Sequence, residues 1–474
     1  MKPMAWMTAG ALIALASAAN AQTAAAPKTV RPDQLVFREL YKELVEINTT
    51  LSVGSCTAAA EAMGARLKAA GYPEADVKVV VEPKHPREGS LVAVLRGTDA
   101  KTPPMLLLAH IDVVEAKRED WTRDPFTLVE ENGYFYGRGT SDDKAQAAIW
   151  VDSLVRLKQA GFKPKRDIKM ALTCGEESEG YNGIEDLVKN HRPLVDAAFA
   201  LNEGASGVLD EQGKAVVLEV QAGEKVYQDF TLTVTNPGGH SSRPASPNAI
   251  YQLAAALDRI GAYKFPPRFN DATRGYFTQM QPRVTPEQAA AMKALVADVN
   301  DPAALAVLTK DATWNSMLRT TCVATMVSAG HAPNALPQRA TANINCRILP
   351  DTPIDEVKAK LTELAADPAV AVTLAHDSKP ASPPPPLTPA IMGPIQKNAA
   401  KVWPGVPILP VMATGATDAV HTSAAGIPTY GVTGLFHGPE GTGAHGLNER
   451  MRVKSLYEGR DFLYGLIQDY AGGK

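Results

Sequence analysis

Unbroken runs of apolar residues constrain the fold of this chain more than any other feature. Residues 105–109 read Met-Leu-Leu-Leu-Ala, and 168–173 and 198–201 are similar strand-like segments. A strand that is apolar at every position must be covered on both faces, as in the sheets of α/β proteins. Segments with helical spacing of apolar residues, such as 33–49 and 145–158, alternate with these strands. The sequence therefore predicts an α/β fold with a mixed sheet and helices on both faces.

The pattern changes near residue 223, which predicts a second unit inserted into the first. Between 227 and 374 the expected elements run strand, helix, strand, strand, helix, strand, an order compatible with a small α+β sandwich. A Pro-rich helical insertion at about 263–320 interrupts this order. Four prolines at 383–386 form a stiff linker, after which strands and helices alternate again. The expected boundaries are 22–223 and 380–474 for the α/β domain and 224–379 for the inserted domain.

The first 21 residues have the features of a secretory signal peptide. Lys2 gives a positive start, residues 9–19 form a short apolar core, and Ala19-Asn20-Ala21 is a cleavage pattern. A buried N-terminal helix is the alternative. Cleavage at this site would place the mature chain, beginning at Gln22, in a periplasm or outside the cell.

Charge and hydropathy argue against two classes of partner. The chain has 48 Lys and Arg against 51 Asp and Glu, a formal net charge of −3. Binding of DNA or RNA needs a basic surface, which this balance does not predict. The sequence also contains no apolar run of the roughly 18–20 residues that span a bilayer. We expect neither a nucleic-acid partner nor a membrane span.

The four cysteines are Cys56, Cys174, Cys322 and Cys346. They form no C-x-x-C pair, so a zinc site built from cysteines is not expected. An exported chain of this length permits disulfides without requiring them. We expect buried free thiols, with a Cys322–Cys346 bridge between two strand-like segments as the alternative.

Acidic and imidazole side chains follow the ends of the predicted strands, where open α/β sheets place their functional sites. Each motif alone has a simpler interpretation. A His-x-Asp pair arises by chance, an Asp before a helix caps it, and a Glu-Glu pair can be a solvated loop. The segments, in chain order, are Leu108-Ala-His-Ile-Asp112, Gly137-Arg-Gly-Thr-Ser-Asp-Asp-Lys144, Thr173-Cys-Gly-Glu-Glu-Ser178, Ala200-Leu-Asn-Glu-Gly204 and Gly443-Ala-His-Gly-Leu-Asn-Glu449.

Taken in order, these motifs resemble the di-zinc metallopeptidase family of glutamate carboxypeptidase, aminoacylase, acetylornithine deacetylase and succinyl-diaminopimelate desuccinylase. The resemblance runs from about Asp33 to the last predicted helix. The forms Asp142-Asp143-Lys144 and Asn202-Glu203-Gly204 are most similar to its carboxypeptidase S and N-acyl-amino-acid branch. Ala145 stands where the family usually has glycine. The resemblance implies a zinc-aminopeptidase-like catalytic domain interrupted by a ferredoxin-like lid domain.

The resemblance also implies a role for each side chain. Two zinc ions, with cobalt or manganese as substitutes, would share one water. Glu176 would be the general base and Asp112 would orient a ligand imidazole. The peptide bond Asp142–Asp143 is expected to be cis. The implied metal ligands are His110 and Glu203 on one ion, Glu177 and His445 on the other, and Asp142 between the two.

Lid residues are implied to hold the substrate. His240, in Pro-Gly-Gly-His-Ser-Ser, would donate to the oxyanion; a histidine in a surface turn is the alternative. Asn334 and Arg347 match substrate-holding positions, and a guanidinium suits a substrate carboxylate. Gly415 and Thr417 belong to a Gly-x-Thr-Asp segment that resembles the family's substrate loop.

The expected activity is hydrolysis of an amide bond in small peptides or N-acyl amino acids, of carboxypeptidase or dipeptidase type. An aminoacylase or deacylase with the same metal site is the first alternative, and a non-catalytic peptide-binding relative is the second. The sequence contains no G-x-S-x-G segment, which disfavours a serine hydrolase. The chain would be a monomer, or a homodimer through the edge strands of the lid if the insertion leaves that edge uncovered.

Overall fold

The computed structural model describes residues 30–178, 180–376 and 383–473. The predicted signal peptide, residues 1–21, lies outside these residues. Among the described residues, no helix combines the length and the apolar character that crossing a bilayer requires.

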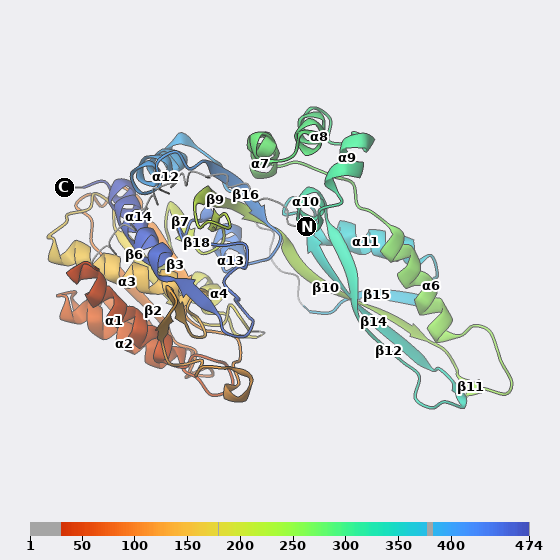
Figure 1. Cartoon of the computed structure of the whole chain (residues 1–474). Coiled ribbons are helices and arrows are strands. Elements are labelled where there is room, and N and C mark those ends of the chain that lie inside the picture. The colour runs from red at the N-terminus through yellow and green to blue at the C-terminus, as the bar shows by residue number, and fades with distance from the viewer. Residues whose placement is uncertain (1–29, 179, 377–382, 474) are drawn as a thin grey trace, which may run out of the picture.

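The first unit is built around a mixed sheet of ten strands within the described ranges (Figure 1). The central strands pair in parallel, and both parallel and antiparallel pairs lie toward the edges. The predicted α/β fold with a mixed sheet is therefore confirmed. The strands are β1 (Val77–Val80), β2 (Ser90–Leu95), β3 (Met105–His110), β6 (Ile168–Thr173), β7 (Phe199–Asn202), β8 (Gly207–Leu209), β9 (Ala215–Glu224), β16 (Ile408–Ala413), β17 (Thr429–Gly431) and β18 (Phe436–His437).

Helices cover both faces of this sheet, as the apolar run of β3 requires. Met105, Leu107 and Ala109 face a core shared with one set of helices, whereas Leu106 and Leu108 face the other set. The alternation follows from the two-residue period of a strand. The first set is α1 (Pro32–Glu46), α2 (Cys56–Ala69), α3 (Lys144–Gln159), α12 (Pro389–Val402) and α14 (Val453–Ala471); the second contains α4 (Gly183–Asn190) and α5 (Arg192–Val195).

The second unit is an antiparallel sheet in the order β12-β14-β10-β15, with α6 (Ala249–Ala262) and α11 (Ile354–Ala365) packed on it. Along the chain, the main elements of this unit follow the strand, helix, strand, strand, helix, strand order that the sequence predicts. The sheet extends away from the first unit, and the short strand β11 (Gly239–His240) lies at its far end (Figure 1). The remaining strands are β10 (Val226–Thr235), β12 (Thr321–Ala329), β13 (Ala335–Leu336), β14 (Arg339–Ile348) and β15 (Val370–Leu374).

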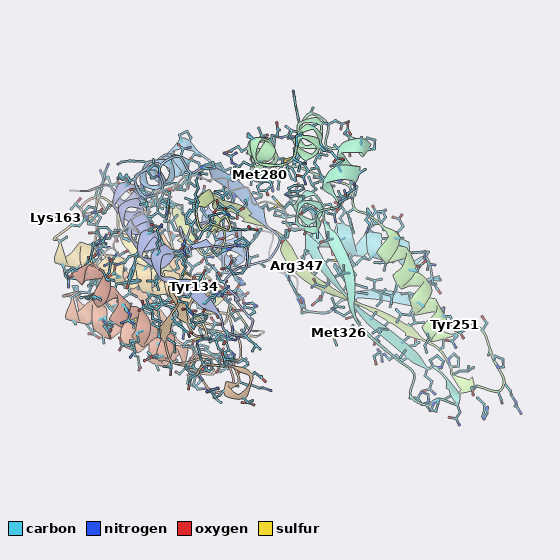
Figure 2. All side chains as sticks on the ribbon, viewed as in Figure 1. Tyr134, Lys163, Tyr251, Met280, Met326 and Arg347 are labelled. Carbon is cyan, nitrogen blue, oxygen red and sulfur yellow. A yellow bond between two sulfur atoms is a disulfide. The ribbon has the colours of Figure 1, made fainter. Side chains whose placement is uncertain are left out.

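The insertion forms helices, as expected, but these helices share a core with the first unit. Phe277, Met292 and Leu308 pack in one cluster with Val217 of β9 and Leu409 of β16. The edge strand β12 therefore stays uncovered by them, and its Met326 is 72% exposed (Figure 2). The helices are α7 (Asp271–Met280), α8 (Pro286–Ala297), α9 (Pro302–Leu308) and α10 (Ala312–Leu318).

A small three-stranded sheet, absent from the sequence prediction, positions the late part of the chain. It consists of β4 (Val129–Glu131), β5 (Tyr134–Tyr136) and β19 (Arg450–Arg452). Arg450 pairs with Tyr136, so the segment that ends at Glu449 lies beside the segment that begins at Gly137. Strands of three residues carry too few side chains for an alternating pattern to stand out.

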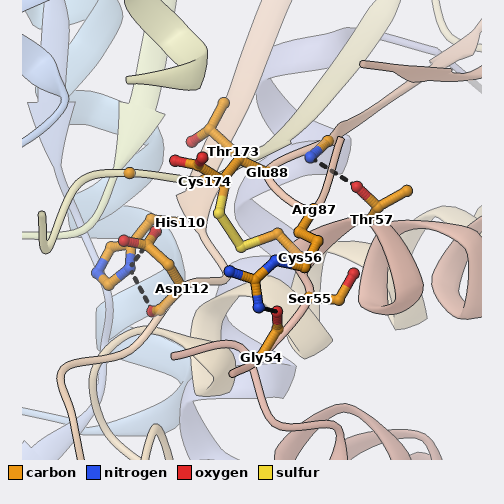
Figure 3. Close-up of a disulfide and its surroundings, with 12 residues drawn as sticks. Gly54, Ser55, Cys56, Thr57, Arg87, Glu88, His110, Asp112, Thr173 and Cys174 are labelled. Carbon is orange, nitrogen blue, oxygen red and sulfur yellow. Dashed lines mark hydrogen bonds and ion pairs between the residues drawn. A yellow bond between two sulfur atoms is a disulfide. The ribbon is translucent and has the colours of Figure 1, made fainter. Parts of the chain in front are cut away.

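The expectation of buried free thiols was wrong, because all four cysteines are in disulfides. Cys322–Cys346 joins the neighbouring strands β12 and β14, as the alternative anticipated. Cys56–Cys174 joins the start of α2 to the residue after β6 (Figure 3). These two cysteines are 118 residues apart, and no local pattern links them.

Removing Cys56–Cys174 should destabilise the chain more than removing Cys322–Cys346. The first bridge closes a loop of 118 residues and the second a loop of 24. The chain-entropy model gives about 5 and about 3 kcal/mol, respectively, because the longer loop restricts the unfolded chain more. Urea unfolding of the double variants Cys56→Ser/Cys174→Ser and Cys322→Ser/Cys346→Ser measures both. A larger loss for the second pair would contradict the prediction.

Candidate active site

His110 ends β3 and is held from both ring nitrogens. Its Nδ1 donates to the backbone carbonyl of Asp112 at 3.1 Å, which fixes the ring with Nε2 directed at the carboxylates of the site. Nε2 lies 3.0 Å from Asp142 Oδ1 and 3.7 Å from Glu203 Oε1. Burial opposes a charge on this imidazole, but the carboxylates of Glu203, Asp112 and Asp142 raise its pKa well above the ordinary value. The ring is 1% exposed, and Nε2 is the nitrogen that faces Asp142 and Glu203.

Asp142 lies between two imidazoles. Its Oδ1 faces His110, and its Oδ2 lies 3.2 Å from Nε2 of His445. The same His445 nitrogen is 2.8 Å from Glu177 Oε1. The peptide bond Asp142–Asp143 is cis, as expected. Asp142 thus directs one carboxylate oxygen toward each of the two imidazoles, those of His110 and His445.

The loop that carries Asp142 is held by Glu449. One oxygen of this carboxylate accepts from the N–H of Gly139 at 2.9 Å, and the other accepts from Ser141 at 2.7 Å and Asp142 at 3.0 Å. Arg138 donates to Glu449 at 3.0 Å, and both side chains are buried. Sequence reasoning missed this role, although Glu449 lies in the quoted segment that contains His445. A carboxylate that accepts from backbone N–H groups produces no sequence motif, because every residue type except proline provides such a group.

Asp112 organises the Glu176-Glu177 pair as well as His110. The N–H of Glu177 donates to Asp112 Oδ2 at 2.9 Å, and that of Glu176 to Oδ1 at 3.4 Å. Burial raises the pKa of Glu176 well above the ordinary value, and the carboxylates of Asp418 and Glu177 raise it further. A carboxylate of raised pKa is a stronger base than an ordinary glutamate.

The donor set fits divalent cations. His110, Asp142 and Glu177 each offer an atom within 4.8 Å of one another, and so do His110, Asp143 and Glu203. Imidazole nitrogens and carboxylate oxygens are ligands that zinc and similar ions accept. Asp143 Oδ2 is buried without a hydrogen-bond partner, and burial raises the pKa of Asp143 and Glu203. Cations would offset the repulsion among these buried carboxylates. Sequence reasoning assigned Asp143 no role in this group.

The predicted lid residues are not gathered at this site within one chain. His240 is exposed on β11, at the far end of the lid sheet (Figure 1), where its Nδ1 accepts from Ser242. The backbone carbonyl of Asn334 accepts from Ser241 at the same end. Arg347 lies at the other end of the sheet, where it stacks on Tyr227 (Figure 2). These positions are too distant along the sheet for the lid residues to act together in a single chain.

The loop of Gly415 and Thr417 does lie beside the site. Asn202, which precedes Glu203, donates to Thr417 Oγ1 at 3.2 Å. The next residue, Asp418, accepts from Thr173 at 2.8 Å and from Asn182 at 2.7 Å. The loop is thereby tied to the ends of β6 and β7.

Glu224, at the end of β9, holds the same loop and should make stability depend on pH. Its Oε2 accepts from the N–H and the hydroxyl of Thr417, and burial raises its pKa to about 8. Because the pKa of Glu224 is higher in the folded than in the unfolded chain, its neutral carboxyl favours the folded state. This contribution to stability is complete below about pH 4.5 and is lost as pH rises through about 8. Glu224→Gln should therefore raise the free energy of unfolding near pH 9 by on the order of 3 kcal/mol.

Urea unfolding of wild type and Glu224→Gln near pH 5 and near pH 9 checks this expectation. The gain should appear at the higher pH, because the wild-type carboxyl is neutral at the lower one. The same difference at both pH values would mean that ionisation of Glu224 plays no part.

Comparison with known proteins agrees with this geometry. The model of "Peptidase family M20/M25/M40" matches residues 106–469. The N-fatty-acyl-amino acid synthase/hydrolase PM20D1 of Xenopus tropicalis is 31% identical over 386 residues, covering 79% of this chain and 74% of the relative. Aminoacylase-1 of Mus musculus is 26% identical over 396 residues, covering 81% and 84%.

A solved structure supports the fold. The M20 family metallo-carboxypeptidase Sso-CP2 from Sulfolobus solfataricus has a TM-score of 0.67 at 18% identity, covering 93% of this chain and 100% of that one. The family model spans more than half of the chain and includes all five implied metal ligands and Glu176. The chain therefore belongs to peptidase family M20/M25/M40 and is an amide-bond hydrolase of that metal-dependent family.

Proposed function

We propose that this chain hydrolyses N-acyl amino acids or small peptides with two zinc ions and with Glu176 as the general base. The observation that carries the proposal is Asp142, which directs one carboxylate oxygen at His110 and the other at His445. The names of the relatives, an N-fatty-acyl-amino acid synthase/hydrolase and an aminoacylase, favour the N-acyl amino acid class. A carboxypeptidase or dipeptidase with the same site is the second candidate, favoured by the likeness to carboxypeptidase S-like proteins.

The residues of the chain would divide the work as follows. His110 and Glu203 would hold one ion, Glu177 and His445 the other, and Asp142 both. When bound, the ions would lower the pKa of a water molecule and polarise the scissile carbonyl. Glu176 would accept a proton from the attacking water and return it to the leaving amine. Asp112 would keep His110 and the Glu176-Glu177 backbone in place through the hydrogen bonds described above.

Metal removal tests this proposal. The purified chain should contain about two divalent ions, measured by plasma mass spectrometry. A chelator should abolish hydrolysis of N-acyl amino acids and dipeptides, and zinc, cobalt or manganese should restore it. Hydrolysis that survives complete metal removal would contradict the metal mechanism. A chain that binds two ions yet cleaves no amide would instead be a non-catalytic binding relative.

We also propose a homodimer through the lid edge. In one chain His240 lies away from the metal-binding side chains, so a second chain would have to supply it as the oxyanion donor. The uncovered strand β12 exposes Val323, Met326 and Val327, an apolar edge that would pair with its copy. Light scattering should give the mass of two chains, and Met326→Lys should give one. A wild-type monomer with full activity would overturn this arrangement.

Secretion is the proposed location. The support is the signal-peptide pattern of residues 1–21, together with the two disulfides, which form and persist in oxidising compartments. N-terminal sequencing of the mature protein should begin at Gln22. Retention of Met1 in the active protein would contradict it.

A further inference from the structure

A cavity of about 310 Å³ adjoins the candidate active site, and its lining includes both cysteines of the disulfide drawn in Figure 3. Asp112, Glu177 and both cysteines of Cys56–Cys174 line it. This volume is at the lower end of the roughly 300–1,000 Å³ found for small-molecule pockets. Of the proposed metal-holding groups and the proposed base, only Glu177 lines the cavity.

Apolar groups form much of its wall. Leu51, Val113, Val114 and the two cysteines of the disulfide line it. Leu51 is 50% exposed on a loop that is held in place: Arg87 donates to the backbone carbonyls of Leu51, Ser52 and Gly54. An exposed aliphatic side chain fixed beside a cavity offers a ready contact for an apolar ligand.

The charged side chains of the lining already have partners in the protein. Arg87 is engaged by the loop carbonyls. Glu115 accepts from the N–H and hydroxyl of Ser52, and Glu88 pairs with His85 at 2.8 Å. Asp112 and Glu177 belong to the hydrogen bonds of the site. Four carboxylates against one guanidinium also disfavour an anionic ligand.

We propose that this cavity is the acyl subsite, which receives the aliphatic chain of an N-acyl amino acid. The proposal rests on the proposed function. The chain would lie along Leu51, Val114 and the disulfide, with its carbonyl end at Glu177. The carboxylate of the amino acid would point the other way, because the acidic lining repels it. The volume suits a medium-length chain.

The test compares chain lengths in wild type and two loop variants. N-acetyl, N-butanoyl, N-hexanoyl and N-octanoyl derivatives of one amino acid are assayed. Wild-type kcat/KM should rise roughly three- to fourfold per added CH₂ until the cavity is full. Leu51→Asp should lower kcat/KM for the octanoyl substrate at least tenfold more than for the acetyl substrate. Val53→Asp is the matched control, because Val53 is 74% exposed on the same loop and does not line the cavity.

Two results would overturn the subsite. One is a flat wild-type dependence on chain length; the other is an equal response of the profile to Leu51→Asp and Val53→Asp. Thermal unfolding of both variants checks that they fold, and Leu51→Ser replaces Leu51→Asp if the latter does not.

If the wild type cleaves no N-acyl amino acid, the proposed substrate class fails, and binding decides the subsite separately. Calorimetry with the metal-loaded enzyme compares sodium octanoate with sodium acetate. Octanoate should bind at least tenfold more tightly than acetate in wild type and Val53→Asp, and this difference should disappear in Leu51→Asp. Equal binding of the two anions by wild type would overturn the subsite independently of turnover.

Discussion

Replacing Glu176 with glutamine should lower kcat by about 10²–10⁴-fold while the metal content stays unchanged. Glutamine keeps the size of the side chain but cannot accept the proton of the attacking water. Glu176 is not among the side chains grouped with His110 as donors. Its backbone N–H still reaches Asp112, so the loop should keep its form. Steady-state kinetics and metal analysis on the same preparation measure both effects.

Glu177→Gln is the matched comparison, one residue further along the same loop. Glu177 contacts His445 and lies in the donor group, so its loss should lower metal content together with activity. Wild-type turnover in Glu176→Gln would exclude Glu176 as the base. Loss of metal in Glu176→Gln would mean that Glu176 helps to bind metal and would contradict its proposed role in proton transfer alone.

Replacing Glu449 with alanine should lower the free energy of unfolding by about 3–5 kcal/mol. The change removes the acceptor of three backbone N–H groups and leaves the buried guanidinium of Arg138 without its carboxylate. An unpaired buried charge is costly, and the loop that carries Asp142 loses its anchor. Urea unfolding and metal titration should therefore both change.

Glu440→Ala is the control for a nearby acid on the surface. Glu440 is exposed and accepts from Tyr134, so its loss should cost less than about 1 kcal/mol. Glu449→Gln, which keeps an acceptor oxygen, should fall between the two. Equal stability of Glu449→Ala and Glu440→Ala would mean that the buried pair contributes little.

The main elements could be predicted because their signals are local. The apolar run 105–109 predicts a strand covered on both faces, and in the structure different helices cover its two faces. The family resemblance of the ordered motifs also implied which acids and imidazoles lie close together. Asp142 contacts both His110 and His445, and His445 contacts Glu177.

The remaining features depend on contacts between distant parts of the chain. Cys56 and Cys174 meet because the start of α2 lies near the end of β6. Nothing in the local sequence of either segment indicates that the two are neighbours. Glu449 acts on backbone N–H groups, which any sequence provides. The distance of His240 from the metal-binding side chains follows from the length of the lid strands, and no motif reports that distance.

The grip of Glu449 on the Asp142 loop also bears on how the protein is made. Synthesis runs from the N-terminus, so residues 110, 142, 177 and 203 leave the ribosome long before residues 445–449 follow. Until that late segment docks through β19, a nascent chain has neither His445 nor the anchor of Asp142 in place. The loop of Asp142 therefore reaches its final form only after the last part of the chain has been synthesised and has docked.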